Sequence, residues 1–184
     1  MHKLLTGAAL AALMGTSAMA SGIEITVAGE ANGTVSIDLL EDVAPQHVAR
    51  ITALAESGQY DGVVFHRVID GFMAQTGDVE HGKMGSDMRR AGTGGSDMPD
   101  LPAEFSDVEF EKGVVGMARA QNPNSANSQF FIMFDAAPFL NGQYTVVGRV
   151  TEGQDVVDAI KRGTGGNGAV VGQPDVMEKV TVID

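Results

Sequence analysis

The stretch FHRVIDGFMAQTGD, residues 65–78, decides the fold of this chain. It predicts two short strands joined by a tight turn at Asp70-Gly71, because this residue pair favours the backbone of a hairpin. Side chains alternate between the two faces of a strand, so Arg67 should share a face with Phe65 and Ile69. An arginine among apolar strand residues needs either an ionic partner or a function.

Short segments rich in β-branched and aromatic residues recur through the rest of the chain and predict further strands. Glycine-bearing turns separate many of them. The predicted strands are Ile23–Val27, Thr34–Leu39, Val63–Ile69, Val114–Ala118, Gln129–Phe134, Thr145–Val150 and Val176–Ile183.

Two segments have the apolar spacing of helices instead. Residues Ala44–Ser57 carry an i, i+3, i+4, i+7 apolar stripe and have Pro45 at the first helical position. The pattern repeats in Glu152–Arg162, whose last turn is basic. The glycine-rich stretch Gly163–Gly168 follows as a surface loop. Many short strands with two helices predict a mainly β fold, a closed antiparallel barrel with the helices over its open ends.

Composition limits the class of protein. The chain has 184 residues and a formal net charge of −12, with 24 acidic against 12 basic side chains. Its 43% hydrophobic and 20% charged residues are typical of a globular domain. The negative charge repels nucleic acid phosphates and anionic lipid surfaces, which argues against both as partners. The absence of cysteine excludes disulfides, cysteine-ligated zinc and a thiol nucleophile.

Residues 1–20 have the pattern of an export signal. Lys3 precedes an apolar run, Leu4–Met14, that is too short to span a bilayer. Ala18-Met19-Ala20 fits a signal-peptidase site, so we expect cleavage after Ala20. The mature domain would then be residues 21–184, with no membrane span, in a bacterial periplasm.

All ten aromatic residues lie between Tyr60 and Tyr144. Strands near both ends of the chain have none, so aliphatic side chains can fill much of the barrel. The concentration of aromatics in the middle therefore predicts a second apolar cluster or an apolar groove. Phe65 and Phe130 are expected to pack in the core.

Several separated motifs together resemble one known family. They are residues 65–78, the GTGG of Gly92–Gly95, the PNSANSQFFI of Pro123–Ile132, Phe139–Gly142 and Tyr144–Val150. In type, order and spacing they are similar to the signature stretches of the cyclophilin-type peptidyl-prolyl isomerases. The resemblance implies a closed eight-stranded antiparallel β-barrel capped by two helices. It also implies catalysis of rotation about X-Pro bonds in unfolded or extended polypeptides, by a monomer that needs no metal or cofactor.

The resemblance also implies a site. Arg67 would be catalytic together with Gln75, and His66 beside them would be structural. The proline ring would bind among Phe72, Met73, Phe131 and Leu140, and the extended substrate would lie along Ala118, Arg119 and Ala120. The remaining residues expected to contact substrate are Gly92, Gln129, Phe139 and Tyr144.

The sequence departs from the family pattern at three places. Phe139 stands where compact eukaryotic members carry Trp, and Tyr144 where they carry His, so we expect weak cyclosporin binding at most, because an indole N–H donor is lost. Arg119 replaces the Asn of many members. The loop Val79–Ala91 is longer than in compact members and is a candidate for a function particular to this chain.

Two other classes of protein remain alternatives to an exported folding enzyme. The first is a binding or chaperone module that keeps the groove without catalysis, although the intact set around Arg67 argues against it. The second is a hydrolase built from His66, Asp78 and Ser128, residue types that most chains of this length contain. Soft copper(I) could also bind the side chains in or near the long loop, but their irregular spacing favours a solvated loop without metal. These side chains are His81, Met84, Met88 and Met98.

Overall fold

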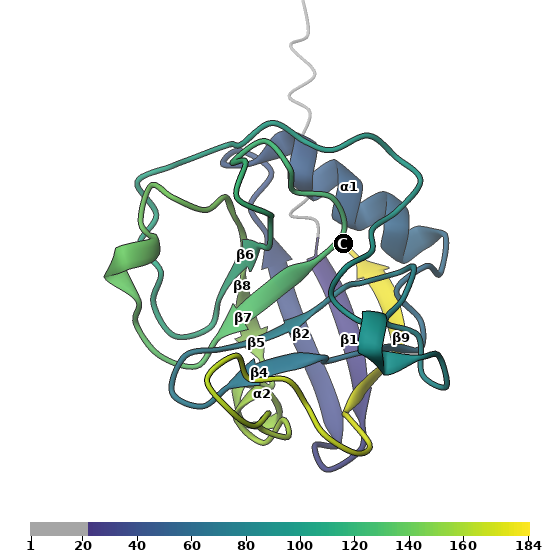
Figure 1. Cartoon of the computed structure of the whole chain (residues 1–184). Coiled ribbons are helices and arrows are strands. Elements are labelled where there is room, and N and C mark those ends of the chain that lie inside the picture. Colours follow the sequence, from purple (N-terminus) through teal and green to yellow (C-terminus); the bar gives the residue numbers. More distant parts are fainter. Residues whose placement is uncertain (1–21) are drawn as a thin grey trace, which may run out of the picture.

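The computed structural model describes residues 22–184, so the predicted signal segment lies outside the described residues (Figure 1). The described chain forms one antiparallel sheet with the strand order β3-β9-β1-β2-β8-β6-β7-β5-β4. The strands are β1 (Gly22–Ala28), β2 (Gly33–Leu39), β3 (Val63–Val64), β4 (Arg67–Ile69), β5 (Met73–Thr76), β6 (Val114–Met117), β7 (Phe130–Met133), β8 (Val146–Glu152) and β9 (Val176–Ile183).

The sheet curls on itself but is not the closed eight-stranded barrel that we predicted. It has nine strands, and no ladder joins its two end strands, β3 and β4. A side-chain bond bridges this region instead, from Thr76 Oγ1 to the carbonyl of Val64 at 2.9 Å. The predicted strand Val63–Ile69 is divided at this point, because Val63 and Val64 pair with β9 whereas Arg67–Ile69 pair with β5.

The same break corrects the predicted alternation of side chains. Phe65 and Val68 both enter the core, whereas Arg67 points outward and is only half-buried. A regular strand would place Phe65 and Arg67 on one face. The break therefore lets Arg67 follow a core phenylalanine and still reach the surface.

Helix α1 (Pro45–Glu56) matches the prediction closely and lies at one end of the curled sheet (Figure 1). Its apolar stripe, which includes Val48, Ile51 and Leu54, is buried. Its first residue is a proline and its cap has no side-chain acceptor. The carboxylate of Glu104 accepts instead from the backbone N–H groups of Gln46 and His47, at 3.1–3.2 Å. These groups have no partner within the helix.

Helix α2 (Gln154–Asp158), at the other end, is shorter than the predicted Glu152–Arg162 (Figure 1). Glu152 belongs to β8, and Gly153 with φ of +80° makes the turn into the helix. The N–H of Lys161 bonds to the carboxylate of Asp175 at 2.7 Å, beyond the end of the helix. Within residues 22–184, no helix is long and apolar enough to cross a membrane.

The buried side chains form two clusters on opposite faces of the central strands. Strand β7 shows the division, because Phe130 and Ile132 face the interior of the curl, whereas Phe131 and Met133 join the second cluster outside it. Of the two arrangements predicted for the central aromatics, a second cluster or an apolar groove, the second cluster is present, and Phe65 and Phe130 lie in the core as expected. Strand β7 is apolar on both faces, as expected for a strand covered on both sides.

The long loop is closed at its base by one buried carboxylate. Asp78 Oδ1 accepts from the N–H groups of Glu80 and His81, and Oδ2 accepts from those of Gly92 and Gly94, all within 3.1 Å. Burial by itself raises the pKa of Asp78, but the four donated bonds outweigh burial and hold the pKa below its ordinary value. We call this arrangement the Asp78 clip.

Replacing Asp78 by Asn should lower the free energy of unfolding by about 2–4 kcal/mol, because an amide offers one acceptor oxygen where four N–H groups need partners. Urea unfolding measures the loss. The same substitution at the exposed Asp97 is the control and should change stability by less than about 0.5 kcal/mol.

The Asp78 clip should also make stability depend on pH. Because the folded pKa is depressed, the contribution is complete above the unfolded pKa of about 3.9 and is lost as pH falls through the folded value. Wild type should therefore lose more stability in acid than Asp78→Asn does. Equal stability of both proteins at neutral pH would contradict this account of the clip.

Candidate functional site

Two adjoining cavities open on the face of the sheet formed by β4 to β7. The larger has a volume of about 480 Å³ and the smaller about 360 Å³. Gln75, Ala118 and Arg119 line both. Every residue predicted from the sequence for the site lines at least one of them.

The larger cavity has an apolar floor that belongs to the second core cluster. Met73 and Phe131 come from neighbouring strands and face the same side. Met73 pairs with Met133 and lies one residue from the inward-facing Ala74, and Phe131 lies between the inward-facing Phe130 and Ile132. Leu140, from the short 3₁₀ helix η2 (Pro138–Leu140), completes the floor.

Aromatic side chains border this floor. Phe72 lies at the turn between β4 and β5, and its ring centroid is 5.5 Å from that of Phe139, which is 69% exposed. Tyr144 packs edge-on against Phe131 at 5.8 Å. The cavity can therefore accept a small apolar ring and cover it with aromatic groups.

Arg67 is held at the edge of the larger cavity by two hydrogen bonds. Its Nε donates to the carbonyl of Asn167 at 2.8 Å, and its Nη1 donates to Gln75 Oε1 at 3.1 Å. Asn167 belongs to the predicted surface loop Gly163–Gly168, which lies against β4 through bonds in both directions between Val68 and the loop ends. Of the five guanidinium N–H groups, three have no partner among the described residues and can donate to a bound molecule.

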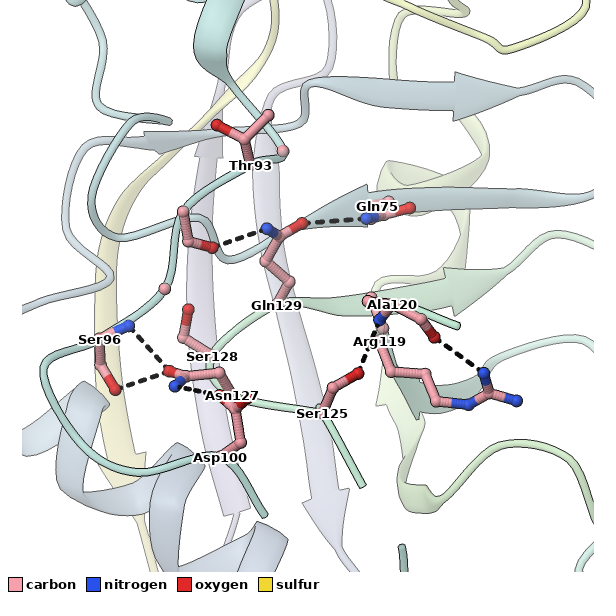
Figure 2. A pocket seen from close by; sticks show the side chains of 14 residues that line it. Gln75, Thr93, Ser96, Asp100, Arg119, Ala120, Ser125, Asn127, Ser128 and Gln129 are labelled. Atoms are coloured by element: carbon pink, nitrogen blue, oxygen red, sulfur yellow. Dashed lines mark hydrogen bonds between the residues drawn. The ribbon is translucent and has the colours of Figure 1, made fainter. Parts of the chain in front are cut away.

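The bond to Gln75 continues into a chain of amides (Figure 2). Gln75 Nε2 donates to Gln129 Oε1 at 3.0 Å, and Gln129 Nε2 donates to the carbonyl of Gly94 at 2.9 Å. We call the sequence from Asn167 through Arg67, Gln75 and Gln129 to Gly94 the amide relay. Gly94 is also held by the Asp78 clip, so the relay connects the arginine to the base of the long loop.

The smaller cavity has mostly polar and backbone walls (Figure 2). Asn127 organises one wall, because its Oδ1 accepts from the N–H and hydroxyl of Ser96, and its Nδ2 donates to Met98 and Asp100. The buried Arg50 of α1 supports this wall from below by donating to the carbonyl of Asn127 at 3.1 Å.

Arg119 stands between the cavities. Its guanidinium lies over the ring of Tyr144, 4.4 Å from the centroid, and donates to the carbonyls of Gln143, Ala120 and Gln121 at 2.9–3.3 Å. The side chain is therefore fixed in one position, although it is only partly buried. Figure 2 shows it extending away from the smaller cavity.

The hydrolase alternative fails on geometry. Ser128 is buried and its hydroxyl donates to the carbonyl of Gly77 at 2.7 Å, while Asp78 is engaged in its clip. Both ring nitrogens of His66 are buried without a hydrogen-bond partner. Burial lowers the pKa of His66, and the negative charge of Asp78 opposes this shift only in part. The lowered pKa keeps the imidazole ring neutral at neutral pH. These three side chains do not form a nucleophilic triad.

His66 lies behind the wall of the smaller cavity rather than in it. Gly92 has φ of +91°, which L side chains rarely adopt, and a Cβ there would lie 2.9 Å from His66 Nε2. Only glycine fits this close approach. His66 therefore supports the loop that carries Gly92, in agreement with its expected structural role.

Several residues that line the cavities were missed from the sequence. Most of them lie inside the motifs at Gly92–Gly95 and Pro123–Ile132, which were therefore a usable signal, whereas Ser96, Asp100 and Gln143 lie outside every motif. The missed lining residues are Thr93, Gly94, Gly95, Ser96, Asp100, Ser125, Asn127, Ser128 and Gln143.

The long loop, by contrast, contributes little to the cavities. None of residues 79–91 lines either one. Nor does any group of three or more His, Asp or Glu side chains among residues 22–184 have the arrangement of a metal site.

Comparison with known proteins identifies the family. The sequence model described as "Cyclophilin type peptidyl-prolyl cis-trans isomerase/CLD" matches residues 23–182. A probable peptidyl-prolyl cis-trans isomerase of Brucella suis is 61% identical over 153 residues, which cover 82% of this chain and 78% of the relative. Peptidyl-prolyl cis-trans isomerase cyp18 of Streptomyces antibioticus is 37% identical over 164 residues, 82% of this chain and 93% of that protein.

Solved structures agree with these relatives. Cyclophilin AquaCyp293 from Hirschia baltica superposes with a TM-score of 0.68 at 27% identity, covering 87% of this chain and 73% of that one. A cyclophilin-type isomerase of Cryptosporidium parvum gives 0.74 at 23% identity, covering 90% and 99%, and supports the fold alone. On the sequence match, the relatives and the shared fold, this chain belongs to the cyclophilin-type peptidyl-prolyl cis-trans isomerases.

Proposed function

We propose that Arg67 catalyses the rotation about X-Pro peptide bonds and that the enzyme assists the folding of exported polypeptides. One observation carries the catalytic part of this proposal. A guanidinium fixed by Asn167 and Gln75 keeps unused N–H donors beside an apolar cavity of about 480 Å³. A proline ring in the cavity would place its peptide bond next to those donors.

The chemistry follows from the barrier to rotation. A peptide bond resists rotation by about 18–20 kcal/mol because the nitrogen lone pair is delocalised into the carbonyl. In the twisted state the lone pair returns to nitrogen, which becomes a better hydrogen-bond acceptor. Arg67 stays protonated at physiological pH and can donate to that nitrogen or to the substrate carbonyl. A donor that binds the twisted amide better than the planar one lowers the barrier.

The other residues bind and orient the substrate in this proposal. Phe72, Met73, Phe131 and Leu140 hold the proline ring, and Phe139 covers it. The segment from Ala118 to Ala120 leads from one cavity to the other and provides an edge for the extended chain. No bond is made or broken, so the reaction needs no nucleophile, metal or cofactor.

Arg67→Ala should lower kcat/KM for a proline-containing tetrapeptide by about 10²–10³-fold, the loss typical of removing one preorganised donor to a transition state. Arg67→Lys keeps the charge but loses the fork and should also be strongly impaired. Arg90→Ala removes an equal charge from an exposed site outside both cavities and is the control.

The same series separates catalysis from a chaperone role. Near-wild-type isomerisation by Arg67→Ala, with an unchanged far-UV spectrum, would rule out the proposed mechanism. An inactive wild type that still suppresses aggregation of unfolded protein would favour the binding module instead.

Gly168→Ala should reduce kcat by about tenfold or more, because it moves the carbonyl that positions Arg67. Gly168 has φ of +71°, and a Cβ there would overlap Ile69 and lie 3.0 Å from the carbonyl of Val68. Gly166→Ala is the matched control in the same loop, since a Cβ there meets nothing within 4 Å. Exchange of the Arg67 Hε proton, followed by NMR, reports directly on the bond to Asn167. Faster exchange with unchanged kcat would show that this bond is dispensable.

Export is supported by the pattern of residues 1–20. The short apolar run Leu4–Met14 and the Ala18-Met19-Ala20 sequence have the arrangement of a cleavable signal. Full-length protein made in a Gram-negative host should be recovered from the periplasmic fraction with Ser21 as its first residue. Ala20→Leu should block this processing. Unprocessed protein confined to the cytoplasm would refute the export proposal without affecting the proposed catalysis.

A further inference from the structure

The larger cavity has an unusual balance of charge for this protein. Two arginines, Arg67 and Arg119, line it, and no aspartate or glutamate does. The whole chain carries 24 acidic side chains against 12 basic ones. None of the ion pairs among residues 22–184 includes either arginine. The cavity is therefore a local centre of uncompensated positive charge.

The contacts of Arg119 hold its charge in place without neutralising it. Its partners are the carbonyls of Gln143, Ala120 and Gln121 and the ring of Tyr144, all of them uncharged. These bonds use four of its five N–H groups and leave one Nη2 hydrogen without a partner among the described residues. Because the fork is already ordered, a bound anion loses little of its binding energy to fixing the side chain.

Arg119 also has a definite place relative to the substrate. It lines both cavities, so it stands where a peptide leaves the cavity that holds proline and passes toward the other. The residue that it meets is consequently a neighbour of the proline rather than the proline itself. Arg67, by contrast, faces the peptide bond that rotates.

We propose that Arg119 forms a carboxylate-binding subsite that selects polypeptides with an acidic side chain next to the proline. The inference rests on the proposed function of the larger cavity and names its substrate class. The overall negative charge of the protein does not prevent this preference. Salt at physiological strength screens exposed charges beyond about 8 Å, whereas a pair in a half-buried cavity is screened much less.

The test uses blocked, amidated peptides with one proline in an alanine background, so that no chain-terminal carboxylate is present. Glu, Gln or Lys is placed in turn at each of the two positions before the proline and at the one after it. At one position or more, kcat/KM should follow the order Glu, Gln, Lys, with Glu about three- to tenfold above Gln, the range for one half-exposed charged hydrogen bond. Molar salt should shrink that ratio.

Variants of Arg119 test whether this residue causes the preference for Glu over Gln. The ratio of Glu to Gln should fall to about one in Arg119→Gln and persist in part in Arg119→Lys. Arg90→Gln, with the same change of net charge outside both cavities, should keep the full ratio. A Glu preference that survives in Arg119→Gln would overturn the assignment to this residue.

Binding measurements keep this inference separate from the proposed function. Dissociation constants of the Glu and Gln peptides, from NMR titration, should differ in the same sense as kcat/KM for wild type. If wild type isomerises none of the peptides, the proposed function fails, but the ratio of dissociation constants still decides the inference. Equal constants and equal rates for Glu and Gln peptides in wild type would disprove the subsite.

Discussion

Strand β7 must be buried on both faces, and the rest of the molecule is arranged around that requirement. Phe130 and Ile132 fill the interior of the curled sheet, while Phe131 and Met133 turn the opposite way. One strand therefore supplies part of the core and part of the cavity floor. The cavity floor is therefore as rigid as the core, because close-packed side chains cannot shift gradually without losing contacts. A peptide bound there meets a preformed surface and orders few side chains.

The polar half of the site is built on this apolar base by hydrogen bonds between distant parts of the chain. The amide relay joins a carbonyl near the C-terminal end, Asn167, to one in the middle, Gly94, through Arg67 and two glutamines. Amides suit this task because each both donates and accepts and carries no net charge. The guanidinium is thus oriented without a carboxylate, which would reduce the field that the substrate experiences. Arg119 is likewise oriented by backbone carbonyls and an aromatic ring rather than by a carboxylate.

The sequence predicted most strands, helix α1 and the residues that meet in the cavities, because motif and periodicity are local signals. It did not predict the break at Phe65–His66, where the chain passes from pairing with β9 to pairing with β5. Nor did it predict the shortness of α2, since Gly153 and the bond from Lys161 to Asp175 limit the helix from outside it. Asp100 and Gln143 were missed for the same reason: their place in the site depends on partners remote in the chain. Long-range contacts of this kind leave no periodic pattern.

The Asp78 clip has a consequence for how this molecule can vary. One oxygen fixes the chain as it leaves the sheet, and the other fixes it as it returns at Gly92 and Gly94. The exposed turn around η1 (Met88–Arg90) therefore lies outside the amide relay, and it reaches the smaller cavity only through the bonds that Thr93 donates to the carbonyl of Arg90. Insertions and deletions in this turn can accumulate without moving the end of the amide relay. The turn is therefore a place where lineages can diverge freely, and where a foreign epitope can be grafted onto a working enzyme.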